Sequence, residues 1–346
     1  MKSTRVLQTA AAVLALGTTL AACGSSSDSS AAAASESTPK LKIMVGGLDK
    51  VIYLPAKLTE QLGYFKDAGV DVQLLSEPSG ADAETLLIAK QVDGVVGFYD
   101  HTVAIQTKGK CLESVVQFSK APGEVEVVAN TSPITSPSDF KGKKLGVTSP
   151  GSSTDFLTQA LAVKAGVQPG DYTTVKAGAG DTFIAALKQG AINAGMTTDP
   201  TVARLLAAKQ AKVLVDMRTS EGSQAALGGP YPSSSLYMDC DYVAKHKDAV
   251  QKMANAFVKT LKWISENDAQ TIADKMPADY AGSDKALYVS AVKATVPMFT
   301  NDGVMPDGGP ETVLKVLGTF SPNVKGKEAQ IDLSKTYTTE FVKAAH

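Results

Sequence analysis

Short apolar runs alternate with longer amphipathic segments from residue 41 onward. The first run ends at Gly46 and Gly47, which is typical of a strand that leads into a turn. The next segment predicts a helix that ends at Gly63, because glycine readily adopts the left-handed conformation after a last helical turn. This rhythm predicts a mostly parallel sheet with helices on both faces, built from strands at 41–45, 70–75, 95–98 and 115–118 and helices at 53–62 and 81–90.

The same rhythm starts again near residue 144. In each half a strand closes on an aspartate, Asp100 or Asp199, just before a helix, so we interpret the two halves as a weak internal repeat. From residue 241 the pattern is mostly helical and includes an amphipathic run at 250–265. The second half predicts strands at 144–148, 173–175, 192–196 and 212–215 and helices at 154–165, 182–189 and 201–209.

The first residues have the pattern of an export signal. Lys2 and Arg5 precede an apolar run of roughly 15 residues, which is shorter than the ~20 residues that a membrane-spanning helix needs. The run ends in Leu-Ala-Ala-Cys at residue 23, which resembles the lipobox of bacterial lipoproteins, in which the cysteine is acylated. The alternative is an ordinary signal peptide beside a chance cysteine. We expect a signal peptide at 1–22, a lipid anchor on Cys23 and a flexible Ser/Ala-rich linker over 23–39, on an exported chain that faces the periplasm or exterior.

Charge and composition narrow the function. The chain has 34 Lys and Arg residues against 35 Asp and Glu residues, so it lacks the basic character of nucleic-acid-binding proteins. Three His and three Cys residues, widely separated, do not make a zinc ligand set. We therefore expect no nucleic acid, no metal and no cofactor, and a monomeric chain.

Three segments resemble one family of binding proteins. The sequences LGYFKDAGVDV at 62–72, SDFKGKKLGVTSPGSS at 138–153 and AALKQGAINA at 185–194 are similar to segments of the periplasmic solute-binding proteins of nitrate, sulfonate and taurine ABC transporters. The resemblance covers residues 40–240 and implies a type II periplasmic-binding-protein fold with two α/β lobes that close on a ligand. It implies lobe one at 40–131 and 232–346, lobe two at 132–231, and crossings near 127–132 and 229–235. The implied partners are a small-molecule ligand and a transporter permease.

Ligands of such folds bind outside the carboxyl ends of the strands, so the loops there are the candidate site. The best candidate is the turn that contains Ser149, Ser152, Ser153 and Thr154, because hydroxyl groups and a helix N-terminus both donate hydrogen bonds. The alternative is that one hydroxyl merely caps the helix. The further candidates are Tyr53, Ser79, Gly80, Tyr99, His101, Thr198, Asp199 and Tyr231, some of which have helix capping or packing as the simpler explanation.

The turn at 149–154 and the loop at 77–81, which contains Ser79 and Gly80, have no Lys or Arg. This argues against an inorganic anion as the ligand. We expect a small organic ligand, either a sulfonate, an aromatic carboxylate or a pyrimidine-like molecule. Some relatives of this fold are enzymes that make a pyrimidine precursor of thiamine and use a cysteine-rich motif. Cysteines at 23, 111 and 240 do not form such a motif, and no Gly-x-Ser-x-Gly or Walker sequence is present, so we expect no enzyme activity.

Two further questions stay open at this point. The same fold also serves ligand sensors that report to a membrane signalling partner, so sensing is an alternative to transport. Cys111 and Cys240 fall at the end of the lobe-one sheet away from the cleft. We expect them to form a disulfide in an oxidising compartment, with two buried free thiols as the alternative.

Overall fold

The computed structural model describes residues 38–345. The expected signal peptide, the acylated Cys23 and nearly all of the expected linker lie outside these residues. No helix within 38–345 is long and apolar enough to cross a membrane.

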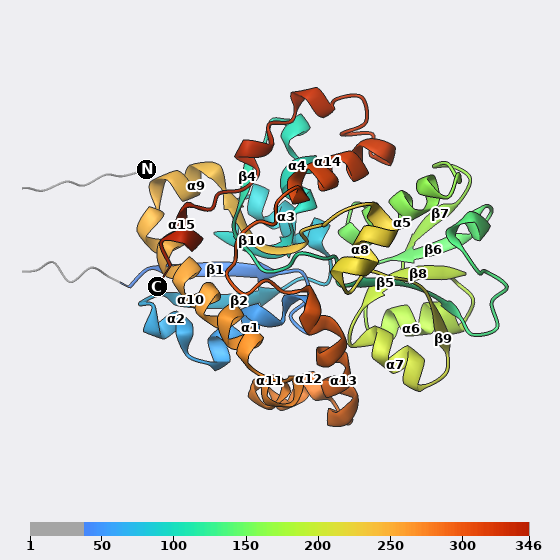
Figure 1. The fold of residues 1–346 in the computed structure, drawn as a ribbon, viewed down its shortest axis with the longest axis horizontal. Coiled ribbons are helices and arrows are strands. Elements are labelled where there is room, and N and C mark those ends of the chain that lie inside the picture. The colour runs from blue at the N-terminus through green and yellow to red at the C-terminus, as the bar shows by residue number, and fades with distance from the viewer. Residues whose placement is uncertain (1–37, 346) are drawn as a thin grey trace, which may run out of the picture. The chain divides into compact units, whose positions relative to one another are not determined.

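Two five-stranded sheets form the framework, and helices flank them (Figure 1). In the first sheet, β1 pairs in parallel with β2 and β3, whereas β10 runs antiparallel between β3 and β4. The strand order is β2-β1-β3-β10-β4, with β1 at Lys40–Val45, β2 at Asp71–Ser76, β3 at Gly94–Phe98, β4 at Leu112–Gln117 and β10 at Ser234–Asp239.

The second sheet repeats this arrangement. β6 pairs in parallel with β7 and β8, and β5 runs antiparallel between β8 and β9. Each sheet is therefore mixed, because one strand enters it from the other half of the chain. The order is β7-β6-β8-β5-β9, with β5 at Glu124–Ala129, β6 at Lys144–Val147, β7 at Thr173–Lys176, β8 at Ala194–Thr198 and β9 at Ala211–Asp216.

One crossing between the sheets differs from the sequence expectation. The family resemblance implied a crossing near 127–132, with lobe one extending to residue 131, but 124–129 is the strand β5 of the second sheet. The chain therefore leaves the first sheet within 118–123. Both glutamates of this strand are buried. The return crossing occupies the segment between α8 and β10, close to the expected 229–235.

Helices cover both sheets, and two pairs of helices pack against each other across the halves. α14 packs on α5, with the Phe156 and Phe320 ring centroids 6.0 Å apart, and α13 packs on α7. The helices are α1 Leu54–Gln61, α2 Tyr64–Asp67, α3 Gly80–Ile88, α4 Asp100–Ala104, α5 Ser153–Lys164, α6 Asp181–Lys188, α7 Thr201–Ala207, α8 Ser220–Leu227, α9 Cys240–Lys245, α10 Lys247–Glu266, α11 Ala269–Lys275, α12 Ala278–Ala281, α13 Lys285–Thr295, α14 Gly309–Phe320 and α15 Glu340–Lys343.

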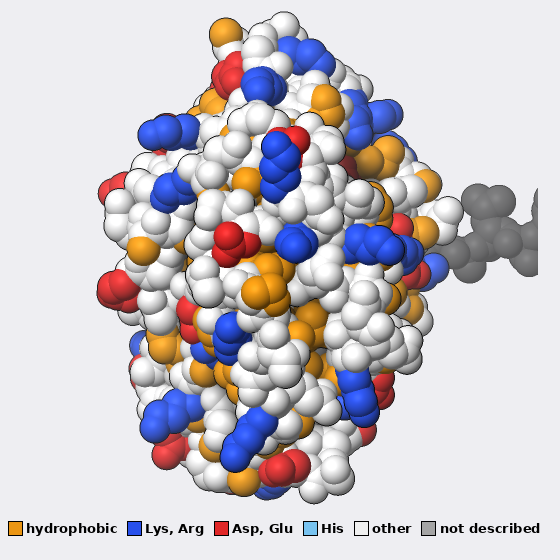
Figure 2. Space-filling model, turned by 90° about the vertical axis from the view of Figure 1, so that its right-hand side faces the viewer, with side chains coloured by type: hydrophobic (Ala, Val, Ile, Leu, Met, Phe, Trp, Pro, Cys, Tyr) orange, Lys and Arg blue, Asp and Glu red, His pale blue; other side chains and the backbone are white. Residues whose placement is uncertain are grey.

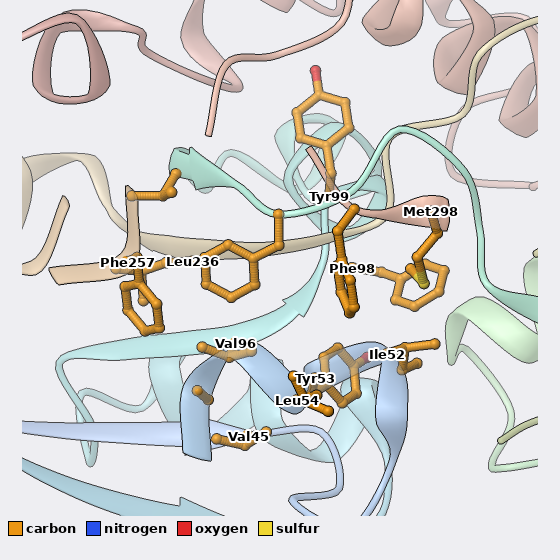
Figure 3. Packing of buried hydrophobic residues seen from close by; sticks show 14 of the residues in the cluster. Val45, Ile52, Tyr53, Leu54, Val96, Phe98, Tyr99, Leu236, Phe257 and Met298 are labelled. Carbon is orange, nitrogen blue, oxygen red and sulfur yellow. The ribbon is translucent and has the colours of Figure 1, made fainter. Parts of the chain in front are cut away.

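The largest hydrophobic core lies under the first sheet and continues toward the second. The Tyr53 and Phe98 rings meet edge to face with centroids 6.3 Å apart, and the Phe118 and Phe257 centroids are 4.7 Å apart (Figure 3). The face that carries the second sheet shows Lys and Arg side chains dispersed among acidic and neutral ones, without a single-sign patch (Figure 2).

Cys111 and Cys240 lie together at the edge of the first sheet where β4 begins and β10 ends. Their Cα atoms are 5.5 Å apart and the two sulfur atoms are joined. This separation lies within the usual range for disulfides. The expected bridge is therefore compatible with the fold, and counting thiols tests whether it forms.

Candidate functional site

The candidate site is built from the segments that follow the parallel strands and precede the antiparallel ones. β1, β3, β6 and β8 all end at the edges where the two halves meet. β5 and β10 run in the opposite direction, so their first residues lie at the same edges. This is the position at which open α/β sheets bind ligands.

Asp100 is the centre of the polar contacts between the halves. Its Oδ1 accepts a hydrogen bond from Ser153 Oγ at 2.9 Å, and its Oδ2 accepts one from the Tyr231 hydroxyl at 3.0 Å. All three side chains are buried. Burial raises the pKa of the Asp100 carboxyl, and the hydrogen bonds from Ser153 and Tyr231 partly offset this rise. The sequence placed Asp100 only at the end of a strand ahead of a helix and not among the candidate residues, so its bridging contacts were missed.

Four more predicted residues lie beside this centre. The Ser79 and Ser149 hydroxyls are 2.5 Å apart, which joins the loop before α3 to the loop after β6. A Cβ atom on Gly80 would lie 2.9 Å from His101 Nε2, so glycine is needed for the helix and the imidazole to approach each other. His101 Nδ1 lies 2.7 Å from Glu84, while its buried Nε2 has no partner in the described part of the chain.

Three predicted residues point away from the junction, which is the region where the strand ends of the two halves meet. The Ser152 hydroxyl donates to Ser149 O at 2.6 Å, and Thr154 Oγ1 accepts from Thr148 N at 2.9 Å, so both hydroxyls stabilise their own turn. Figure 3 shows Tyr99 pointing away from Tyr53. Its hydroxyl lies 2.5 Å from Thr336 Oγ1.

Asp199 lies on a second flank of the junction. Its Oδ1 accepts from Ala203 N at 3.0 Å, as expected for an aspartate near a helix start. Its Oδ2 contacts Arg218 at 3.0 Å and accepts from Thr295 Oγ1 at 3.2 Å, and its carbonyl accepts from Val51 N at 3.0 Å. Thr295 and Val51 belong to the half of the chain that builds the first sheet, so Asp199 also bridges the two halves.

Two charged residues complete the site and were missed from the sequence. Lys50 Nζ donates to Gly46 O and Pro78 O, both at 2.8 Å, and burial lowers its pKa to about 8. Glu124 is 2% exposed, lies opposite Thr198 in the β5–β8 register, and its Oε2 has no hydrogen-bond partner within 38–345. Burial raises the pKa of Glu124 well above its usual range, and the nearby Asp100 adds to the rise.

Tyr53 and Tyr231 enclose these charges. Burial raises the pKa of both hydroxyls well above the usual value, and the carboxyl groups of Asp100 and Glu124 contribute further. The sequence signal for Glu124 was a charged residue at the start of an apolar strand. That signal equally fits an exposed strand face, and only the sheet order shows that the side chain is buried.

The chemistry of the site is that of polar recognition away from water. Within 38–345 no group of three or more His, Cys, Asp and Glu side chains is placed to hold a metal ion. Hydroxyl, carboxyl and ammonium groups converge from both halves, and buried groups of this kind discriminate strongly between ligands that satisfy them and ligands that do not.

The two mixed α/β sheets, which meet at their strand ends, are those of the periplasmic-binding-protein fold. The chain belongs to the NMT1/THI5 like family, which matches residues 53–271. A solved protein from Bordetella bronchiseptica RB50 is 33% identical, with 88% of this chain and 96% of that one covered and a TM-score of 0.84. The alkanesulfonate-binding protein SsuA from Xanthomonas axonopodis pv. citri, bound to MOPS, shares the fold at 16% identity, with 87% and 98% covered and a TM-score of 0.70.

The curated relatives correct one expectation. The 4-amino-5-hydroxymethyl-2-methylpyrimidine phosphate synthase THI13 of Saccharomyces cerevisiae is 26% identical over 66% of this chain and 68% of its own length. The match to THI11, which has the same synthase name, covers 42% of that protein. Relatives at 25 to 29% identity, including one from Legionella pneumophila, are named as this enzyme. The expectation that the chain has no enzyme activity, which relied on missing motifs, is therefore contradicted.

Proposed function

We propose that the chain captures a small organic molecule between its two sheets and delivers it to an ABC importer. The observation that carries the proposal is the buried contact of Asp100 with Ser153 and Tyr231, which joins the strand ends of both halves through hydrogen bonds. A ligand at this position would contact both halves and stabilise their closure. A Staphylococcus aureus protein of the same fold is named as the ligand binding component of an ABC-type import system, which supports the same role.

Among the three expected ligand classes, the site favours the pyrimidine-like one. It contains the buried carboxyl groups of Asp100 and Glu124, and a buried sulfonate or carboxylate would oppose their ionisation and would itself need a cationic partner. Lys50 is the one lysine at the cluster, and it already donates to two carbonyl oxygens. A ring with amino groups can donate to carboxyl groups. The pyrimidine in the names of the curated relatives supports this choice.

Calorimetry and thermal shift with a panel of ligands test the proposal. The panel contains 4-amino-5-hydroxymethyl-2-methylpyrimidine, cytosine, an alkanesulfonate and benzoate. We expect a pyrimidine to bind and to raise the melting temperature, because a ligand that binds only the native state stabilises it. Failure of every compound to bind at millimolar concentration contradicts the proposal.

A matched pair of variants then locates the site. Tyr231→Phe removes the hydroxyl that donates to Asp100, whereas Tyr99→Phe removes a buried hydroxyl that contacts Thr336 instead. The first variant should weaken binding roughly 10-fold, because it removes a hydrogen bond that favours the closed arrangement of the two halves, and such a bond contributes about 0.5–1.5 kcal/mol. The second should leave affinity unchanged, and equal losses in both variants argue against a site at Asp100.

The curated relatives favour a second candidate, a synthase-type activity on a pyrimidine. Mass spectrometry of the small molecule after incubation with the protein separates the two. Recovery of the unchanged ligand supports capture and delivery, and a new pyrimidine product supports catalysis. A sensor would pass its ligand-bound form to a signalling protein, whereas a delivery protein would dock on a permease. An adjacent permease gene supports import, and an adjacent sensor kinase gene supports sensing.

Export and lipid anchoring at Cys23 belong to the same proposal. Cys23→Ser should abolish labelling by a fatty acid and release the protein from the membrane fraction. We expect more than one acyl chain, because a single chain binds a membrane only marginally. Retained label in the variant contradicts the anchor.

A further inference from the structure

Glu124 is a buried carboxyl group with an unused acceptor. It is the first residue of β5 and 2% exposed, and its Oε2 has no partner among residues 38–345. Buried polar groups are almost always hydrogen-bonded, and leaving one without a partner is unfavourable. A group of this kind at a candidate binding site indicates that the missing donor comes from a ligand.

Three nearby protein groups donate to partners other than Glu124. The Ser153 and Tyr231 hydroxyls donate to Asp100, and Lys50 Nζ donates to two backbone carbonyls. Both oxygens of Asp100 are therefore satisfied within the protein, whereas Glu124 Oε2 is not. The two carboxyl groups differ in role although they lie in one cluster.

The backbone holds Glu124 in place. Gly123 N donates to Met217 O at 3.0 Å, and Met217 N donates to Glu124 O at 3.0 Å. Gly123 has φ +72°, and a Cβ atom there would lie 2.7 Å from Ile52 Cγ2 and overlap Met298. The tight packing at Gly123 fixes the backbone that carries the carboxyl group. It is therefore a preorganised acceptor.

We infer that Glu124 determines ligand specificity by accepting a hydrogen bond from an N–H group of the ligand, which makes the ligand class an amino-substituted nitrogen heterocycle. The inference rests on the proposed function and identifies the protein group that recognises the ligand. Burial also raises the pKa of Glu124 well above its usual range, which favours the protonated form. A carboxylic acid can then donate to a ring nitrogen as well as accept from the neighbouring amino group.

A double-mutant cycle between protein and ligand tests this role. Full-length protein and the Glu124→Leu variant are titrated with 4-amino-5-hydroxymethyl-2-methylpyrimidine and with the analogue that has hydrogen in place of the amino group. We expect the wild type to prefer the amino compound by roughly 10- to 100-fold, as for a buried hydrogen bond to an ionisable group, and the variant to lose most of that preference.

Glu126→Leu is the matched control, because Glu126 lies two residues along the same strand, is equally buried, and contacts Thr158 rather than the junction. Urea unfolding of both variants checks that they fold. Leucine at 124 should fold, because an apolar group replaces an unsatisfied polar one. The control should retain the preference for the amino group.

The outcomes separate the inference from the proposed function. In one outcome the wild type binds the pyrimidine, while the Glu124→Leu substitution and the removal of the ligand amino group change the affinity independently. In that case Glu124 does not bind the amino group, and the inference fails while the proposed function stands. If the wild type binds the sulfonate or benzoate instead, the ligand class is wrong while solute binding stands. If it binds nothing in the panel, both fail.

Discussion

Replacement of Glu126 by glutamine should make the stability of the protein less sensitive to pH. Glu126 is fully buried in β5; Thr158 Oγ1 donates to its Oε2 at 3.2 Å, and its Oε1 has no partner in the described part of the chain. Burial raises the pKa of this carboxyl from 4.5 to about 8, and the hydrogen bond from Thr158 opposes only part of the rise. The side chain is therefore neutral in the folded protein at pH 7.

The sign of the effect follows from the two pKa values. Below pH 4.5 the group is protonated in both the folded and the unfolded chain, and its contribution to stability is fully present. As pH rises toward about 8, the unfolded chain releases the proton while the folded chain retains it, so stability is lost. One unit of pKa difference corresponds to 1.36 kcal/mol, so the loss reaches about 3 kcal/mol at pH 7 and about 5 kcal/mol above pH 8.

Glutamine has nearly the same shape but does not titrate. The free energy of unfolding of Glu126→Gln, minus that of the wild type, should be near zero at pH 4.5 and should grow toward the values above. Urea unfolding at pH 5, 6, 7 and 8 measures this difference. Asp268→Asn is a suitable control, because hydrogen bonds from Thr271 lower the pKa of that exposed cap, so its charge is constant in this range. A difference for Glu126→Gln that does not change with pH refutes the reasoning.

The remaining predictions test packing, closure and the cysteines. Gly123→Ala should destabilise the protein by about 2–4 kcal/mol in thermal or urea unfolding, because a strained backbone adds to overpacking. Gly69→Ala, at a glycine with the same φ of +72° but open space around it, should cost only about 1–2 kcal/mol. Equal losses of stability in the two variants would disprove the packing argument. Ser153→Ala should weaken ligand binding roughly 10-fold or more by removing a bond between the halves, and unchanged affinity would make this serine a mere turn residue. Thiol titration of denatured, unreduced protein should find Cys111 and Cys240 unreactive, and two reactive thiols there would exclude the bridge.

Much of the fold was predictable from local pattern. The strand and helix positions followed from apolar periodicity, and Gly63 does adopt a left-handed conformation where the first helix ends, with φ +75°. The strand β5 was missed; it begins Glu-Val-Glu, and alternation of this kind indicates an exposed face unless the neighbouring strands are known. The family resemblance then supplied the two-lobed architecture that local pattern alone cannot give.

The candidate site was likewise predictable only in part from the sequence. The sequence by itself determined which loops follow the strands, because strand ends and glycine or serine turns are local features; it therefore selected Ser149, Ser153 and Tyr231. Only the tertiary structure decided that Asp100 receives hydrogen bonds from Ser153 and Tyr231, and that Glu124 is buried with a free acceptor. The physical reason is that burial and hydrogen-bond satisfaction depend on residues distant in the sequence, which sheet order and lobe contact bring together.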